Sequence, residues 1–306
     1  MNLSPINQKI LYGFKSEFNE LAQLHKDDKF PNKILLTGEK GIGKCTFALH
    51  LINFILSNDE EYSYDLDNHC INENNKSFRL IYNQSNPNFI LIDIEKKKRF
   101  IDIDQIRNLI LNLNKSSFNS KKRFVLIDNI EFLNINSINA LLKVLEEPNK
   151  NVNFILIGNN KSILPTLKSR CLNFRLSLSN YEVLDIIKKL LSKDIYELIN
   201  KDLFNYYLTP GKIFYLTEFF KEKEINLTKY DLNDFLNLII SENYYKKDAS
   251  AKYILYEFIE LFLLKKVSIK SFDLYSYFIN KINKVKRFNL DEESLFIEFK
   301  HKILNG

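Results

Sequence analysis

The sequence predicts an α/β fold: a parallel sheet in the first half of the chain, followed by helices alone. Four short apolar runs are rich in Ile, Leu, Val and Phe and are bounded by Asn, Gly, Asp or Pro, as buried strands are. They span residues 33–37, 88–93, 123–128 and 153–158. Helical segments separate the runs, which implies parallel strands joined by crossover helices. Residues 171–176 supply a candidate fifth strand.

From Ser179 onward the apolar periodicity is helical only. Ser179 and Glu182 have the spacing of a capping box. Apolar residues follow at helical intervals at Val183, Ile186, Ile187 and Leu190. The Pro210-Gly211 pair interrupts the pattern and marks a joint. A last helix is expected after Asn289, with one face made of Leu295, Phe296, Phe299 and Ile303.

Composition places the chain among globular proteins. Its 306 residues are 45% hydrophobic and 27% charged, and three scattered cysteines suit a reducing cytoplasm rather than a disulfide framework. Residues 258–264 form one of the longest apolar runs, which is too short to span a bilayer. Residues 1–5 show no secretory pattern. The net charge of +6 permits nucleic-acid contact but does not by itself indicate it.

A glycine-rich loop follows the first expected strand. Residues 38–45 read GEKGIGKC, which has the glycine and lysine spacing of a phosphate-binding P-loop. Gly38, Gly41 and Gly43 let backbone N–H groups curl around phosphate. Lys44 is placed to reach the β- and γ-phosphates of a nucleotide. The alternative is a strand-to-helix turn that binds no ligand.

Cys45 occupies the position where a working P-loop has Ser or Thr, whose hydroxyl binds Mg²⁺. Sulfur is a poor ligand for a hard cation that prefers oxygen. Thr46 is adjacent, but one residue step along a helix turns its side chain about 100° away. The loop is therefore compatible with nucleotide binding, whereas Cys45 argues against hydrolysis.

Asp128 ends the third apolar run, as the metal-binding acid of a P-loop ATPase does. Active ATPases of the AAA+ type commonly have a Glu next, which polarises the attacking water. Here the next residue is Asn129, which is not basic enough for that role. Glu131 is nearby but stands two residues too far along the chain. The alternative for Asp128 is a strand-end acid without a function.

Further motifs resemble a known family. Residues 137–148 read SINALLKVLEEP; Ile138, Leu141, Leu142 and Leu145 form one helical stripe, and Pro148 is expected to stop the helix. Residues 169–171 read Ser-Arg-Cys, and residues 101–107 read IDIDQIR. Together with the loop, these strings resemble AAA+ clamp-loader subunits of bacterial DNA polymerase III, over about residues 10–175.

The resemblance implies an architecture and a set of partners. An AAA+ P-loop NTPase domain would span residues 1–176, a helical lid 177–211, and a helical collar for oligomerisation 212–306. The expected partners are gamma/tau and delta subunits in a hetero-pentamer. That complex would load the sliding clamp on primed DNA during replication in the cytoplasm.

The resemblance also gives Arg170 a role as an arginine finger, which acts in the ATP site of a neighbouring subunit. A guanidinium suits this role because it is always charged and its fork matches phosphate oxygens. The departures at Cys45 and Asn129 resemble the delta-prime members of the family, which have little or no ATPase activity. Two alternatives remain: an active gamma/tau-type motor, or a nucleotide-free scaffold of the same fold. For Arg170 itself, the alternative is a surface residue without a role.

Cofactor expectations follow from the same resemblance. ATP would bind weakly or not at all, with Mg²⁺ accompanying any ATP. Many relatives hold zinc with four cysteines, but only His69 and Cys70 stand in that stretch, too few for a tetrahedral site, so no zinc is expected. Residues 57–88 are polar and are expected to contain an irregular insertion. Asn159 is a candidate γ-phosphate sensor, and Lys212, near the position of a second sensor, receives no role.

Overall fold

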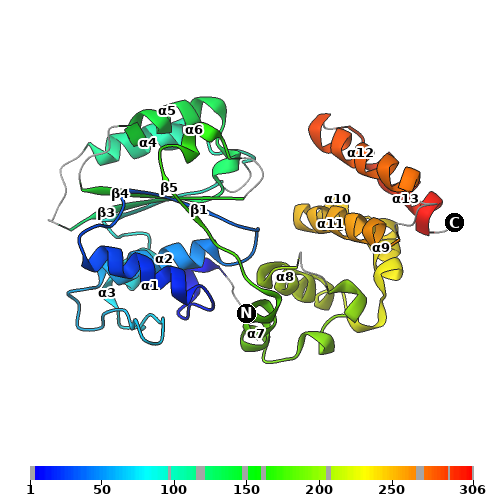
Figure 1. The fold of residues 1–306 in the computed structure, drawn as a ribbon, viewed down its shortest axis with the longest axis horizontal. Coiled ribbons are helices and arrows are strands. Elements are labelled where there is room, and N and C mark those ends of the chain that lie inside the picture. Colours follow the sequence, from blue (N-terminus) through cyan, green and yellow to red (C-terminus); the bar gives the residue numbers. More distant parts are fainter. Residues whose placement is uncertain are drawn as a thin grey trace. The chain divides into compact units, whose positions relative to one another are not determined.

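The computed structural model describes residues 4–95, 98–114, 121–146, 151–159, 163–204, 208–266, 272–288 and 290–304. The chain divides into two compact units, Met1–Ile186 and Ile187–Gly306. The first contains a sheet covered by helices, and the described part of the second is helical (Figure 1). The predicted division into three domains remains a prediction.

The first unit is built on a five-stranded sheet in which all neighbouring strands are parallel. The strand order is β2-β3-β4-β1-β5, so the first strand lies between the fourth and the fifth. The strands are β1 (Lys33–Thr37), β2 (Phe89–Ile92), β3 (Arg123–Ile127), β4 (Val152–Gly158) and β5 (Leu172–Arg175). All five expected strands form, which confirms the α/β fold with a parallel sheet.

Helices cover both faces of this sheet (Figure 1). One layer holds α1 (Lys15–Lys26), α2 (Lys44–Leu56) and α3 (Lys76–Tyr82). The other holds α4 (Ile103–Leu113), α5 (Ile135–Glu146) and the short α6 (Pro165–Lys168). Successive strand residues point to opposite faces. Ile34 and Leu36 therefore join the core beneath α1 and α2, whereas Leu35 joins the core beneath α4 and α5.

Several helices begin where the sequence supplies a capping side chain. Asp102 caps α4 in a capping box with Gln105. In α5 the expected apolar stripe faces the core: Leu141 and Leu145 are fully buried, and Ile138 and Leu142 pack against them. Pro148, expected to stop this helix, lies outside the described residues.

The polar segment 57–88 is irregular on both sides of one short helix, α3. Residues 57–75 contain turns and isolated bridges, one of which pairs Asp65 with Cys70. The helix α3 follows because the Asn75 side chain accepts a hydrogen bond from the Phe78 amide at 2.7 Å. The expected irregular structure is thus present, and a capped helix interrupts it.

The boundary between the two units falls within α7 (Asn180–Leu191), whose capping box joins Ser179 and Glu182 as expected. Pro210 is the first residue of α8, so the Pro210-Gly211 pair starts a helix. The later helices are α8 (Pro210–Lys221), α9 (Leu232–Ser241), α10 (Tyr244–Lys247), α11 (Ala249–Lys266), α12 (Phe272–Phe288) and α13 (Glu292–Phe299). The expected last helix is α13, in which Leu295, Phe296 and Phe299 are buried.

Short helical turns complete the architecture. The 3₁₀ turns are Pro5–Asn7, Ile130–Phe132, Ile195–Glu197, Lys201–Leu203 and Leu227–Lys229, and a π turn spans Lys300–Leu304. The largest fully buried side chains of the second unit are phenylalanines: Phe220, Phe235, Phe258, Phe278, Phe296 and Phe299. In the part of the chain that the structure describes, none of the helices has the length and apolar character needed to cross a membrane.

Candidate nucleotide-binding site

The loop 38–43 connects the end of β1 to the start of α2. Gly38, Gly41 and Gly43 have φ angles of 156°, 87° and 100°, which side chains rarely tolerate. A Cβ atom at Gly38 would overlap the carbonyl oxygen of Leu176 and the side chain of Ile42. The loop stands at the N-terminus of a 13-residue helix, where the helix dipole favours an anion. Its backbone therefore fits a phosphate group.

Lys44 folds back over this loop. Its Nζ donates to the carbonyl oxygens of Gly38 at 2.9 Å and Glu39 at 2.8 Å, and to Asn159 Oδ1 at 3.0 Å. Burial lowers the pKa of Lys44 to about 8, although the negative charges of Asp128 and Glu131 act in the opposite direction. The ammonium is therefore mostly charged at pH 7. A phosphate entering the loop would have to replace some of these acceptors.

Cys45, in the first turn of α2, lies beside Asp128, which follows β3, close enough for the Asp128 carboxylate to raise the pKa of the thiol. Burial, with the nearby Asp128 charge, raises the pKa of Cys45 well above its usual value, so the sulfur stays protonated. Burial also raises the pKa of Asp128 to about 6, and the Asp93 charge adds to this effect.

These residues do not fit a magnesium ion. Mg²⁺ needs oxygen ligands in a near-ideal octahedron, whereas this site places a protonated thiol beside Asp128, the acid that follows β3. Thr46 follows in the first turn of α2 and is half-buried. Its hydroxyl is one helical step, about 100°, away from the direction of Cys45. The loop thus fits phosphate, but its metal-binding position is altered.

Asn129 occupies the position of the missing acid. Its φ of 56° is left-handed, and its amide N–H donates to Asp128 Oδ1 at 2.8 Å. Its side-chain Nδ2 donates to Asp93 Oδ1, also at 2.8 Å. Sequence reasoning missed this contact, although the signal existed: Asp93 and Asp128 end two runs that the fold makes adjacent parallel strands.

Asn159, which follows β4, joins Lys44 to Glu131. Its Oδ1 accepts from Lys44 Nζ at 3.0 Å, and its Nδ2 donates to Glu131 Oε1. The other Glu131 oxygen, Oε2, is buried and has no hydrogen-bond partner among the described residues. Sequence reasoning set Glu131 aside as misplaced. The structure puts it in the site by another route, through Asn159.

Arg170 follows α6 and is not bonded to this cluster. Its Nε and Nη2 donate to Glu146 Oε1 at 3.2 and 2.5 Å. Its Nη1 donates to the carbonyl oxygen of Thr166 at 3.0 Å. About a third of the side chain, 32%, is exposed. Glu146, at the end of α5, is a partner that sequence reasoning did not find.

Lys212 lies in the second unit and is committed to an internal ion pair. Its Nζ lies 2.7 Å from Glu257 Oε1, and the Lys212 side chain is only 6% exposed. The same ammonium lies 5.5 Å from the centre of the Tyr253 ring. These contacts give Lys212 a structural role within the second unit.

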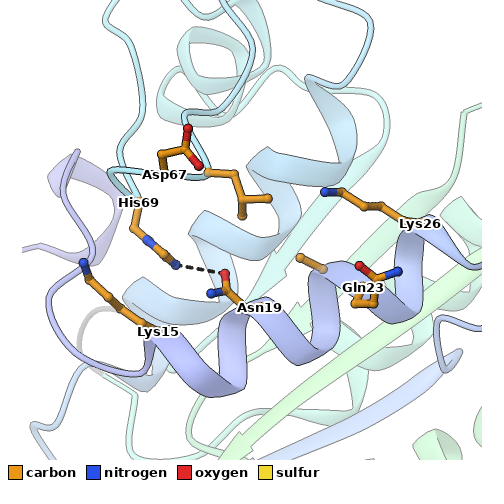
Figure 2. Close-up of a pocket in the computed structure, with 8 residues that line it drawn as sticks. Lys15, Asn19, Gln23, Lys26, Asp67 and His69 are labelled. Carbon is orange, nitrogen blue, oxygen red and sulfur yellow. Dashed lines mark hydrogen bonds between the residues drawn. The ribbon is translucent and has the colours of Figure 1, made fainter.

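His69 and Cys70 make separate local contacts. Figure 2 shows His69 beside a pocket of 390 Å³ along α1, with its Nε2 hydrogen-bonded to Asn19 Oδ1 at 3.2 Å. The Cys70 thiol instead donates to Asp65 Oδ2 at 3.8 Å. Within the described ranges, no group of three or more His, Cys, Asp or Glu side chains is placed to hold a metal ion.

The fold and the loop define a class of protein. A parallel sheet of order β2-β3-β4-β1-β5, with a phosphate-binding loop after β1 and an acid at the end of β3, is a P-loop fold of the AAA+ type. The family model described as DNA polymerase III, delta subunit, matches residues 14–180. This match covers more than half of the chain, which therefore belongs to this family of clamp-loader proteins.

Similar proteins include subunits of two kinds. A DNA polymerase III subunit delta' from Pseudomonas aeruginosa is 32% identical over 151 residues, covering 49% of this chain and 44% of the relative. A subunit gamma from Buchnera aphidicola is 32% identical over 192 residues, covering 61% of this chain and 48% of the relative. The chain thus spans about half the length of the curated relatives it matches.

A solved structure with a similar fold is a DNA polymerase III gamma subunit-related protein from Thermotoga maritima. It is 18% identical with a TM-score of 0.39, and the alignment covers 87% of this chain and 78% of that chain. The Thermotoga maritima RuvB Holliday junction branch migration motor is 14% identical with a TM-score of 0.44, covering 78% and 80%. Both likenesses are loose.

Proposed function

We propose that the chain is a delta-prime-type subunit of the DNA polymerase III clamp loader. It is a non-motor AAA+ subunit that supplies Arg170 to the ATP site of a neighbouring subunit. The observation that carries this proposal is the buried, protonated Cys45 thiol beside Asp128. The thiol stands where an active P-loop has the hydroxyl that binds Mg²⁺.

The other departures support the same conclusion. The side chain after Asp128 is the Asn129 amide, which cannot take a proton from water as a carboxylate does. The guanidinium of Arg170, in contrast, is partly exposed and permanently charged. The chain therefore keeps a group that serves another site while its own site is altered.

The partners and the domain roles belong to this proposal. Gamma/tau and delta subunits complete a hetero-pentamer that loads the sliding clamp on primed DNA in the bacterial cytoplasm. Residues 1–176 form the AAA+ domain, residues 177–211 the lid, and residues 212–306 the collar that holds the subunits together. Asn159, bonded to Lys44, is the sensor of any γ-phosphate.

A second candidate is an active gamma/tau-type motor. It is favoured by the Buchnera aphidicola subunit gamma, whose match extends over 192 residues. Turnover by the isolated chain separates the two candidates. A non-motor subunit should have negligible ATPase activity. A turnover rate of about 1 s⁻¹ or faster that is abolished by Lys44→Ala would identify the motor. A chain that binds no ATP at equilibrium is a scaffold of the same fold.

The arginine finger is tested in the reconstituted complex. Phosphoryl transfer spreads negative charge over the γ-phosphate oxygens, and a positioned arginine accelerates it roughly 10³- to 10⁵-fold at one site. Arg170→Ala should lower the DNA- and clamp-stimulated ATPase only in part, because one of several sites is affected. Arg170→Lys should also be impaired because it lacks the planar fork. Unchanged ATPase and clamp loading at equal assembly would refute the role.

A further inference from the structure

Glu146 is the carboxylate that holds Arg170 within its own chain. Two guanidinium nitrogens, Nε and Nη2, converge on the single oxygen Oε1, at 3.2 and 2.5 Å. The third nitrogen, Nη1, is fixed by the carbonyl oxygen of Thr166 at 3.0 Å. All three nitrogens of the guanidinium therefore have a partner, which defines one orientation of the side chain.

Glu146 is the last residue of α5 that the structure describes, and its carboxylate contacts the Arg170 guanidinium.

We propose that Glu146 is a positioning residue for Arg170: it holds the guanidinium in one orientation until the anionic oxygens of a neighbouring subunit's nucleotide replace it. This inference rests on the proposed function of Arg170. The carboxylate presents the same kind of acceptor as a phosphate, a charged oxygen that matches the guanidinium fork. Replacement of the Glu146 carboxylate by a phosphate therefore leaves the guanidinium N–H groups of Arg170 in the same orientation.

The solvent exposure of the Arg170–Glu146 ion pair shows that Glu146 can orient Arg170 without preventing it from binding a phosphate. The Arg170 and Glu146 side chains are 32% and 50% exposed. Ion pairs this exposed are weak because water and salt screen them. Glu146 therefore cannot compete with a phosphate in a desolvated site. It restricts the rotamers of a flexible side chain, so less conformational freedom is lost when Arg170 docks.

The experiment uses the complex reconstituted with its neighbouring subunits, and compares Glu146→Ala, Glu146→Gln, Arg170→Ala and the double variant Glu146→Ala/Arg170→Ala. Glu146→Ala should lower the Arg170-dependent part of kcat about 5-fold, with KM for ATP unchanged. Glu146→Gln, which keeps an acceptor oxygen, should lie between Glu146→Ala and wild type. The matched control is Asp104→Ala, which removes another exposed arginine pair, Arg107 with Asp104 at 3.2 Å, and should change nothing.

The double variant separates the two claims. In the Arg170→Ala background, Glu146→Ala should have no further effect on kcat, because the residue that it positions is gone. A further loss there, or an increase of kcat in Glu146→Ala alone, would overturn the positioning role while leaving the arginine finger intact. An unchanged kcat in Arg170→Ala would instead refute the finger itself. Raising the salt concentration should bring wild type toward Glu146→Ala, because salt screens the pair.

Discussion

The thiol of Cys45, in the first turn of α2, lies beside the carboxylate of Asp128, which follows β3. In a working P-loop the two corresponding side chains are joined through a metal ion rather than to each other. Burial favours the protonated form of both residues, since their pKa values are raised. With a pKa of about 6 the Asp128 carboxylate is still mostly ionised at pH 7, so the thiol is the neutral member of the pair.

Restoring the hydroxyl should restore part of this site. Cys45→Thr supplies an oxygen ligand at the position of the sulfur and removes the soft group that Mg²⁺ avoids. We expect ATP to bind about 10-fold more tightly in the presence of Mg²⁺ than to wild type, and equally in its absence. Calorimetry with and without Mg²⁺ measures this difference. Cys45→Ala is the control, since it removes the thiol without adding an oxygen, and equal gains in both variants would contradict the prediction.

The same variant should still fail to hydrolyse ATP. The side chain after Asp128 is the amide of Asn129, which is bonded to Asp93 and lacks the basicity to activate water. Cys45→Thr/Asn129→Glu should therefore gain measurable turnover, whereas each single change should not. Steady-state ATPase assays decide the matter, with Lys44→Ala in the double variant as the control that abolishes the gain. Turnover in Cys45→Thr alone would show that Asn129 is not the limiting defect.

The elements of the fold could be predicted because their signals are local. The apolar run 33–37 and the glycines that follow it lie within a dozen residues of the chain, and together they predict a strand and a loop. The strand β1 forms where expected. The contacts within the site depend on strand order instead. Asn159 reaches Glu131 across 28 residues, and Asn129 reaches Asp93 across 36. Separations of 28 and 36 residues do not correspond to a helix or strand periodicity, so the sequence alone does not indicate these pairs. They become visible only once the strand order places β2, β3 and β4 side by side.

The pairing of Arg170 with Glu146 has the same explanation. The two residues are 24 positions apart, in motifs that were read as separate signals. The motif containing Glu146 was interpreted through its apolar stripe, which explains Leu141 and Leu145 but says nothing about a carboxylate at the end of the helix. In the chain, β4 lies between the helix that contains Glu146 and the segment that contains Arg170. The two residues come together only because the chain returns through the sheet along β4 to the same side.

The glycines of the loop should differ in what they tolerate. Gly38→Ala places a Cβ against the backbone carbonyl of Leu176, which cannot move without disturbing β5, so we expect a loss of about 2 kcal/mol or more in unfolding free energy. Gly43→Ala meets nothing within 4 Å and suffers only the strain of φ 100°, about 1 kcal/mol. Urea denaturation measures both, and equal losses would contradict a steric role for Gly38.

The protein purified without chelator should contain no stoichiometric zinc. His69 is bonded to Asn19 and Cys70 to Asp65, so the two candidate ligands serve different contacts. A tetrahedral site needs four ligands, and these two residues alone cannot close it. Elemental analysis settles the point: about one zinc per chain, lost in a Cys70→Ser variant, would show that the missing ligands come from elsewhere.

The stability of the first unit should depend on pH through His50. This imidazole is fully buried, with Nε2 donating to the Gln8 carbonyl at 3.1 Å and Nδ1 accepting from the Tyr64 hydroxyl at 3.0 Å. Burial lowers the pKa of His50 from 6.5 to about 4, so the folded protein keeps it neutral where the unfolded chain binds a proton. Stability from this residue is therefore present above pH 6.5 and is lost as pH falls toward 4.

The expected loss between pH 7 and pH 4 is about 3 kcal/mol from this residue alone. Other groups titrate in the same range, so the test compares wild type with His50→Gln, which can also donate to Gln8 and accept from Tyr64 but does not titrate. The wild type should be the more stable at pH 7, and its advantage should shrink as the pH falls below 6.5. Urea denaturation at several pH values measures the difference. A difference that stays constant across this range would show that His50 titrates alike in the folded and unfolded chains.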